Sequence, residues 1–182
     1  KIYNKRIFEK IPKRGDVVVF KTSYRNDDIF FIRMICNLFN SCKTDFIKRL
    51  IGLPGDKIQF VNGNLFINGL EVTKIRTKEF KSFDTYMETL PNGVTYTAIY
   101  DNQSTSWNNS DLYTVPKGHY FFLGDNRDNS RDSRYISGPG YINKNDLVGK
   151  AKLIFFSNDK NKGGFFKFWK WKNSIRIERF FK

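Results

Sequence analysis

Histidine and cysteine are nearly absent from this sequence of 182 residues. The one histidine, His119, stands just before a strand-like run, so we expect it to be structural. A Ser-His-Asp triad would have to be built on this residue, and its neighbours in the sequence give no support for one. The two cysteines, Cys36 and Cys42, are too few for a zinc site. They either close a small disulfide loop or remain unrelated thiols, and the sequence leaves both possibilities open.

Long apolar runs are also absent. A membrane-spanning helix requires about eighteen uninterrupted apolar residues, and no stretch of the sequence provides them. The sequence opens on Lys1 rather than on methionine, and no charged-then-apolar signal segment follows. We therefore expect any membrane anchor to lie upstream of Lys1.

Acidic residues are scarce relative to basic ones, with 18 Asp and Glu against 32 Lys and Arg, which gives a net charge of +14. Such a charge favours anionic partners, either nucleic acid or an anionic membrane surface. Residues 163–182 interleave aromatic side chains with lysines. This basic aromatic tail suits a lipid interface, although a partly buried amphipathic terminus would have the same composition.

Short apolar runs separated by Gly, Pro and Asn predict a mainly β, antiparallel protein. The dipeptide Asn62-Gly63, between alternating apolar residues, predicts a hairpin, and a second hairpin is expected within 89–100. The apolar run 29–39 fits a short helix or an exposed loop, because its periodicity does not decide between them. The runs expected to form strands are 15–20, 46–52, 57–72, 113–125 and 146–157.

Residues 124–134 read GDNRDNSRDSR and mix both signs of charge densely. In a calcium loop beginning at Asp125, a ligand position would fall on Arg127 and the required glycine on Ser130. We therefore expect no metal here. Taken alone, the segment would form Asx turns with solvated ion pairs.

Three segments, in order along the chain, resemble conserved boxes of the type I signal peptidases. They read PKRGDVVVF (12–20), FIKRLIGLPGD (46–56) and GDNRDNSRDSR (124–134). Members of that family are membrane-anchored serine proteases with a Ser/Lys dyad, and they remove signal peptides from exported proteins. The resemblance extends from Pro12 to Ser157.

The resemblance implies an antiparallel β-sheet catalytic core interrupted by an inserted β subdomain. We expect residues 1–72 and 113–162 to form the two parts of the core. Residues 73–112 would form the subdomain, and the tail would follow at 163–182.

The resemblance also implies that Lys48 is the general base and that Ser130 orients its amine. An ordinary lysine, with a pKa of about 10.4, is protonated at neutral pH, so burial must lower the pKa. Phe46 and Ile47 are further expected to line the groove for an extended substrate. The apolar flanks expected to desolvate the amine are Phe46, Ile47, Leu50 and Ile51.

Supporting roles follow for the rest of the two later boxes. Asp132 and Arg134 are expected to form ion pairs that hold the base in place, with Arg49 taking part. Gly124 would permit close approach of the backbone, and Asp125 opens the same box.

The nucleophile of that family lies in a Ser-Met-x-Pro type of box upstream of the first segment. No Ser-x-x-Pro occurs in this chain, and residues 1–11 contain no serine. We therefore expect a truncated extracytoplasmic portion that lacks the nucleophile and the oxyanion hole and is inactive alone.

The family implies signal peptides of preproteins as substrates, the lipid bilayer surface as a partner, and no cofactor. It also implies a bacterial inner membrane, with the catalytic domain on the periplasmic side. The charge alone would suit a nucleic-acid-binding β domain, which needs aromatics on a basic sheet face. The densest aromatic cluster is instead the tail, so no nucleic acid is expected. A repressor-type self-cleaving protease shares the dyad, but the second and third boxes argue against it.

Overall fold

The structure is a computed structural model that describes residues 11–23, 43–80, 83–101, 108–135 and 138–151. The chain divides after Lys150, and the description below concerns the unit Lys1–Lys150. The apolar run 29–39, both cysteines and the basic aromatic tail lie outside the described residues. Their predicted roles stay predictions.

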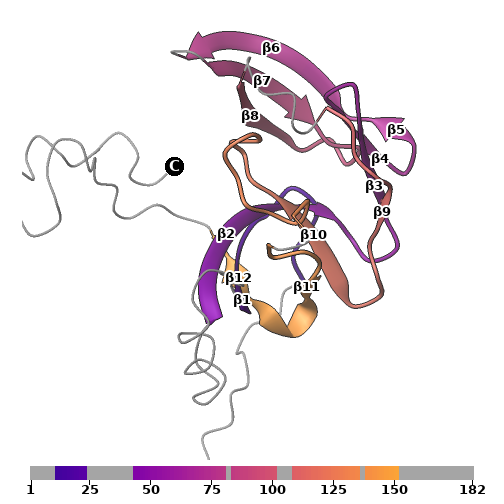
Figure 1. Cartoon of the computed structure of the whole chain (residues 1–182), viewed down its shortest axis with the longest axis vertical. Coiled ribbons are helices and arrows are strands. Elements are labelled where there is room, and N and C mark those ends of the chain that lie inside the picture. The colour runs from indigo at the N-terminus through magenta and orange to yellow at the C-terminus, as the bar shows by residue number, and fades with distance from the viewer. Residues whose placement is uncertain (1–10, 24–42, 81–82, 102–107, 136–137, 152–182) are drawn as a thin grey trace, which may run out of the picture. The chain divides into compact units, whose positions relative to one another are not determined.

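The described chain is mainly β, as predicted, and its strands pair antiparallel within three sheets (Figure 1). The largest sheet has the strand order β11-β10-β2-β1-β12. In chain order, its members are β1 (Val17–Ser23), β2 (Lys43–Gly52), β10 (His119–Leu123), β11 (Ile142–Asn143) and β12 (Leu147–Lys150).

The second sheet has the order β5-β4-β3-β9, and the third has the order β6-β7-β8. The third sheet falls within the range 73–112 that was expected to form an inserted subdomain. A short 3-10 helix, η1 (Lys144–Asp146), precedes β12. The strands of the two smaller sheets are β3 (Lys57–Val61), β4 (Asn64–Ile67), β5 (Leu70–Glu71), β6 (Thr73–Phe80), β7 (Phe83–Thr89), β8 (Thr95–Asp101) and β9 (Tyr113–Thr114).

Both predicted hairpins are present. Asn62 and Gly63 connect β3 to β4 with φ angles of 48° and 76°, the positive values that favour Asn-Gly in a two-residue turn. Asn68 and Gly69 repeat this arrangement between β4 and β5, with φ angles of 54° and 80°. The second predicted hairpin is formed by β7 and β8, which pair along their whole length.

Two buried apolar clusters lie on different sides of β2. Leu50 belongs to a cluster with Phe20 and Phe122, whereas its neighbour Ile51 belongs to a cluster that includes Ile58 and residues of all three sheets. This division follows from the alternation of side chains along a strand. Lys48 therefore lies on the same side of β2 as Leu50, and its neighbour Arg49 lies on the same side as Ile51.

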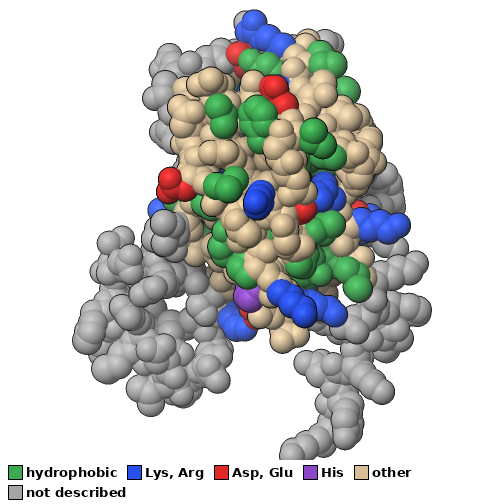
Figure 2. Space-filling model, turned by 90° about the vertical axis from the view of Figure 1, so that its right-hand side faces the viewer, with side chains coloured by type: hydrophobic (Ala, Val, Ile, Leu, Met, Phe, Trp, Pro, Cys, Tyr) green, Lys and Arg blue, Asp and Glu red, His purple; other side chains and the backbone are tan. Residues whose placement is uncertain are grey.

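On the face drawn in Figure 2, Lys and Arg side chains are separated by hydrophobic and other side chains. Within the described ranges, no helix has the length and apolarity needed to cross a bilayer.

Candidate active site

Lys48 and Ser130 meet where β10 ends beside β2. The antiparallel pairing places Leu123, the last residue of β10, opposite Arg49. The loop that follows β10 therefore begins next to Lys48. Within this loop, Ser130 is buried, with 5% of its surface exposed, and Lys48 Nζ donates a hydrogen bond to Ser130 Oγ over 2.8 Å. The structure thus brings together the two residues to which the family resemblance assigned the central roles.

Gly124 makes this approach sterically feasible. A β-carbon built on Gly124 would lie 1.9 Å from Ser130 Oγ and 3.5 Å from Lys48 Nζ. The φ angle of Gly124 is not positive, so the requirement for glycine is one of space and not of backbone conformation. Gly124 is therefore the residue that lets the serine pack against the lysine.

The environment lowers the pKa of the Lys48 amine below its ordinary value of 10.5. Burial is the largest cause, because it disfavours the charged form. Asp132 opposes the shift, Arg134 adds to it, and Asp125 opposes it more weakly. An amine with a lowered pKa has a larger neutral fraction near neutral pH, and only the neutral amine accepts a proton.

Only part of the expected apolar shell surrounds Lys48. Phe46 and Leu50 share its side of β2, and Phe46 stacks on Phe20 with ring centroids 5.8 Å apart. Ile47 is instead 58% exposed, and Ile51 is buried in the other cluster. The four flanks therefore do not act as one shell, because successive residues of a strand face opposite sides.

Asp132 and Arg134 form a buried ion pair, with Nη2 and Oδ2 2.8 Å apart and neither side chain exposed. Arg134 Nε also donates to Asp132 Oδ1 over 2.8 Å. The same carboxylate accepts a hydrogen bond of 2.9 Å from the backbone N–H of Gly124. The pair therefore ties the end of the loop back to its beginning, on either side of Ser130.

Arg49 differs from the expectation. Instead of joining Asp132 and Arg134, it forms a two-pronged ion pair with Asp125, with Nε–Oδ1 and Nη2–Oδ2 distances of 2.8 and 2.7 Å. Its Nη1 donates to the carbonyl of Gly15 over 2.8 Å, and its guanidinium lies 4.3 Å from the centre of the Tyr96 ring. The reason is strand alternation, since Arg49 faces away from Lys48. Gly15, Arg49 and Asp125 bring the three sequence boxes together on that other side.

One pair near the site carries no local signal in the sequence. Arg127, 1% exposed, donates two hydrogen bonds to Glu88 of β7, over 2.9 and 2.6 Å. The sequence shows Arg127 only as a residue that spoils a metal loop, and Glu88 as one acidic residue in a polar region. Recognising the pair requires knowledge of which strand reaches the loop.

Known proteins of one family resemble this chain over most of its length. Residues 2–156 match the family described as signal peptidase, peptidase S26. A protein named signal peptidase I from Rickettsia akari is 35% identical over 190 residues, which cover 97% of this chain and 60% of that protein. One from Rickettsia conorii is 36% identical over 203 residues, which cover 100% of this chain and 68% of that protein.

A crystal structure of a signal peptidase I from Enterococcus faecalis is 28% identical in sequence and has a TM-score of 0.43. The match covers 78% of this chain and 97% of the other chain. The present chain spans 60% to 69% of the length of the Rickettsia proteins that it resembles. The family match over residues 2–156, together with these identities, shows that the chain belongs to the signal peptidase family, peptidase S26.

Proposed function

We propose that this chain carries the general base of a serine endopeptidase that removes N-terminal signal peptides from exported proteins. In this proposal Lys48 is the base and Ser130 orients its amine. The observation that carries it is the contact of 2.8 Å between Lys48 Nζ and the buried Ser130 Oγ. The lowered pKa of Lys48, caused mainly by burial, supports the same role.

The chemistry needs a neutral amine at a fixed position. The base removes the proton of a nucleophilic serine as its oxygen attacks the scissile carbonyl, and then passes a proton to the leaving amine. The contact with Ser130 restricts where the flexible lysine side chain places its nitrogen. The nucleophile in this proposal is the serine of a Ser-x-x-Pro motif, and this sequence contains no such motif.

The burial of Ser130 supports an orienting role over a nucleophilic one. An attacking oxygen must come within about 3–3.5 Å of a carbonyl carbon. Ser130 is 5% exposed and packs against Gly124, which leaves little room for a peptide to approach. A serine in this position is well placed to hold the amine and poorly placed to attack a substrate.

The first part of β2 supports the binding of an extended substrate. Strand β1 pairs with β2 from Lys43 to Arg49, whereas the described pairing of β10 with β2 covers only Arg49, Leu50 and Gly52. Ile47 lies in the part of β2 beyond β10 and is 58% exposed. An extended peptide can add to such a strand through main-chain hydrogen bonds. We therefore retain Ile47, with Phe46, as a groove residue in this proposal.

The proposed place of action is the periplasmic surface of a bacterial inner membrane. The net charge of +14 favours association with anionic lipid head groups. Signal peptides emerge at that membrane, so the enzyme and its substrate would meet there.

The test is cleavage of a preprotein by the complete protein in anionic liposomes, with Lys48→Ala and Ser130→Ala as variants. We expect Lys48→Ala to abolish turnover and Ser130→Ala to lower kcat by about 10²-fold, the scale of one acid–base contribution. Lys57→Ala, at an exposed position at the start of β3, is the matched control and should retain activity.

Two outcomes contradict the proposal. One is turnover of the preprotein by this chain alone, and the other is a covalent acyl-enzyme on Ser130. Salt-dependent binding to DNA without any preprotein cleavage would favour the alternative of a basic nucleic-acid-binding domain.

A further inference from the structure

The loop that carries Ser130 is attached to the three-stranded sheet by a fully buried ion pair. Arg127 Nη1 and Nη2 donate to the two carboxylate oxygens of Glu88 over 2.9 and 2.6 Å, and each side chain is 1% exposed. The hydroxyls of Tyr96 and Tyr100, both from β8, accept further hydrogen bonds from Arg127 and donate to Glu88. Four side chains from two strands and one loop therefore form a closed polar network.

Both charges of this network are retained in the folded protein. Burial, the largest influence on Glu88, raises its pKa, but Arg127 and the hydrogen bonds from the two tyrosines outweigh it and leave the pKa below its ordinary value. Burial likewise lowers the pKa of Arg127, and Glu88 with the tyrosines more than reverses this effect. A buried charge without its partner is costly, so the loop and the sheet are held together strongly.

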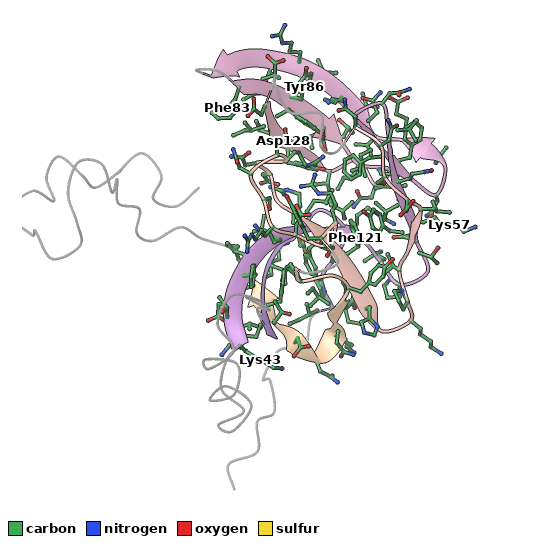
Figure 3. The ribbon with its side chains drawn as sticks, in the orientation of Figure 1. Lys43, Lys57, Phe83, Tyr86, Phe121 and Asp128 are labelled. Atoms are coloured by element: carbon green, nitrogen blue, oxygen red, sulfur yellow. The ribbon has the colours of Figure 1, made fainter. Side chains whose placement is uncertain are left out.

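Backbone hydrogen bonds also attach the loop to the three-stranded sheet. Ile99 of β8 donates its N–H to the carbonyl of Asp125 and accepts from the N–H of Arg127, each over 2.8 Å. Asn126 forms a parallel bridge with Ile99, and the Asp128 carboxylate accepts from the N–H of Asp101 over 2.7 Å. Figure 3 shows Asp128 beside the three-stranded sheet. The first part of the loop is thus joined to β8 by a single parallel bridge.

Contacts lead from Arg127 through Arg134 and Asp132 to the backbone of Gly124, against which Ser130 packs. The carbonyl of Arg127 accepts a hydrogen bond from Nη2 of Arg134, and Arg134 is paired with Asp132. Ser130 lies between these attachment points in the chain. The position of its hydroxyl is therefore set by Arg127 on one side and by the Asp132–Arg134 pair on the other.

We propose that Glu88 is a positioning residue for the Lys48–Ser130 pair. It acts through Arg127, which fixes the loop so that the Ser130 hydroxyl meets the lysine amine at the buried end of β2. This inference rests on the proposed role of Lys48 as the base. Under this proposal the three-stranded sheet supports the active site indirectly. In the described contacts, none of its residues touches the Lys48 amine.

The test is the titration of Lys48 by NMR in this chain, which needs neither a nucleophile nor a substrate. The ¹³Cε signals of labelled lysines report each amine, and the signal of Lys48 is identified by its loss in Lys48→Arg. In Glu88→Gln the loop loses its charged anchor and the amine becomes better hydrated. We expect the neutral fraction of Lys48 at a given pH to fall about threefold to tenfold, which is a rise in pKa of about half a unit to one unit.

Asp84→Asn is the matched control, because it also replaces a carboxylate of β7 by an amide, and Asp84 forms an ion pair with Arg76 of β6. We expect the titration of Lys48 to be unchanged in this variant. Tyr100→Phe is the milder second variant, for use if Glu88→Gln does not fold. It removes one hydroxyl that contacts both Glu88 and Arg127 and should shift Lys48 in the same direction.

The amide signals of residues 124–134 are a second readout that is independent of catalysis. If Glu88→Gln unfolds more easily but leaves Lys48 titration and these amide signals as in the wild type, Glu88 is structural only and the inference is wrong. If wild-type Lys48 titrates like an ordinary lysine, the proposed function is contradicted. Displacement of the Gly124 and Ser130 amide signals in Glu88→Gln would then still support the positioning role, and unchanged signals would refute it.

Discussion

Gly124 and Ser130 are in such close contact that no side chain fits between the backbone of the first and the hydroxyl of the second. A methyl group on Gly124 would lie 1.9 Å from Ser130 Oγ and 2.4 Å from Ser130 Cβ. Since both residues are buried, the serine cannot move aside without moving its loop. The glycine and the serine therefore form a single structural unit beside Lys48.

Gly124→Ala is expected to displace Ser130 and to impair the lysine without removing either group. Overpacking of this kind costs about 1–3 kcal/mol of stability, and the misplaced base should lower kcat about 10²-fold in the complete protein. Denaturant unfolding and preprotein cleavage measure the two effects. Gly149→Ala on β12 is the control, because a β-carbon there meets open space and the φ angle is not positive. Equal effects of the two substitutions would contradict the steric argument.

The pH dependence of stability should contain a contribution from Lys48. The folded pKa is lowered from 10.5, mainly by burial, so the unfolded chain still binds a proton at pH values where the folded chain has lost it. Stability due to this group must therefore rise with pH from the folded pKa up to about 10.5, and stay constant at lower pH, where both states are protonated. Urea unfolding at a series of pH values, for wild type and for Lys48→Met, measures this difference.

We expect the wild type to gain stability relative to Lys48→Met across that alkaline window. Lys57→Met is the control, because Lys57 is exposed on β3, and the variant should parallel the wild type. Parallel pH profiles for the wild type and Lys48→Met would show that the amine titrates alike in both states. That result would exclude a Lys48 amine whose pKa is lowered by burial in the folded protein.

Stability should also reveal that Arg127 and Glu88 are coupled. Arg127→Met leaves the Glu88 carboxylate buried without its countercharge and should cost about 3–5 kcal/mol near neutral pH. In that variant burial raises the pKa of Glu88, so acidification protonates the carboxyl and part of the loss should be recovered. In the wild type the opposite holds, because the lowered pKa of Glu88 means that stability is lost as pH falls through it.

The double variant Glu88→Leu with Arg127→Met completes the cycle. It removes both charges, so it should be more stable than Arg127→Met alone. Guanidinium unfolding of the wild type, the two single variants and the double variant gives the coupling free energy between Glu88 and Arg127. Additive losses would mean that the two side chains do not depend on each other.

The parts of the fold that were predictable are those encoded within a few residues. Asn and Gly both tolerate the positive φ angles observed at Asn62 and Gly63, so this dipeptide was enough to predict the hairpin. The contact of Lys48 with Ser130 followed from the resemblance of two whole segments to a known family. In both cases the information lies in the local sequence or in a motif with fixed spacing.

The choice of partners was less predictable. Arg49 was expected near Asp132 and Arg134, and it pairs with Asp125 because its strand turns it away from Lys48. The pairing of Arg127 with Glu88 depends on how β7 and β8 lie against the loop, which no spacing in the sequence encodes. Which of these side chains form ion pairs depends on how the three sheets and the loop pack against one another.

The last prediction concerns Asp56, which connects the first two boxes. Its Oδ2 accepts from Arg14 over 2.8 Å and from the Leu53 N–H over 2.5 Å, and its Oδ1 accepts from Asn68 over 2.9 Å. Arg14 also donates to the carbonyl of Ile51, so it joins the first box to the end of β2. Asp56→Ala leaves these donors without their acceptor and should cost about 2–4 kcal/mol.

Urea unfolding near neutral pH measures this loss, with Asp111→Ala as the control because Asp111 is exposed. The loss should shrink as pH falls. Burial alone would raise the pKa of Asp56, but the hydrogen bonds from Arg14, Asn68 and Leu53 outweigh it and lower the pKa below 3.8. Stability from this group is therefore present above the ordinary pKa and disappears as pH falls through the folded one. A loss that is the same at acidic and neutral pH would show that the charge of Asp56 does not hold the two boxes together.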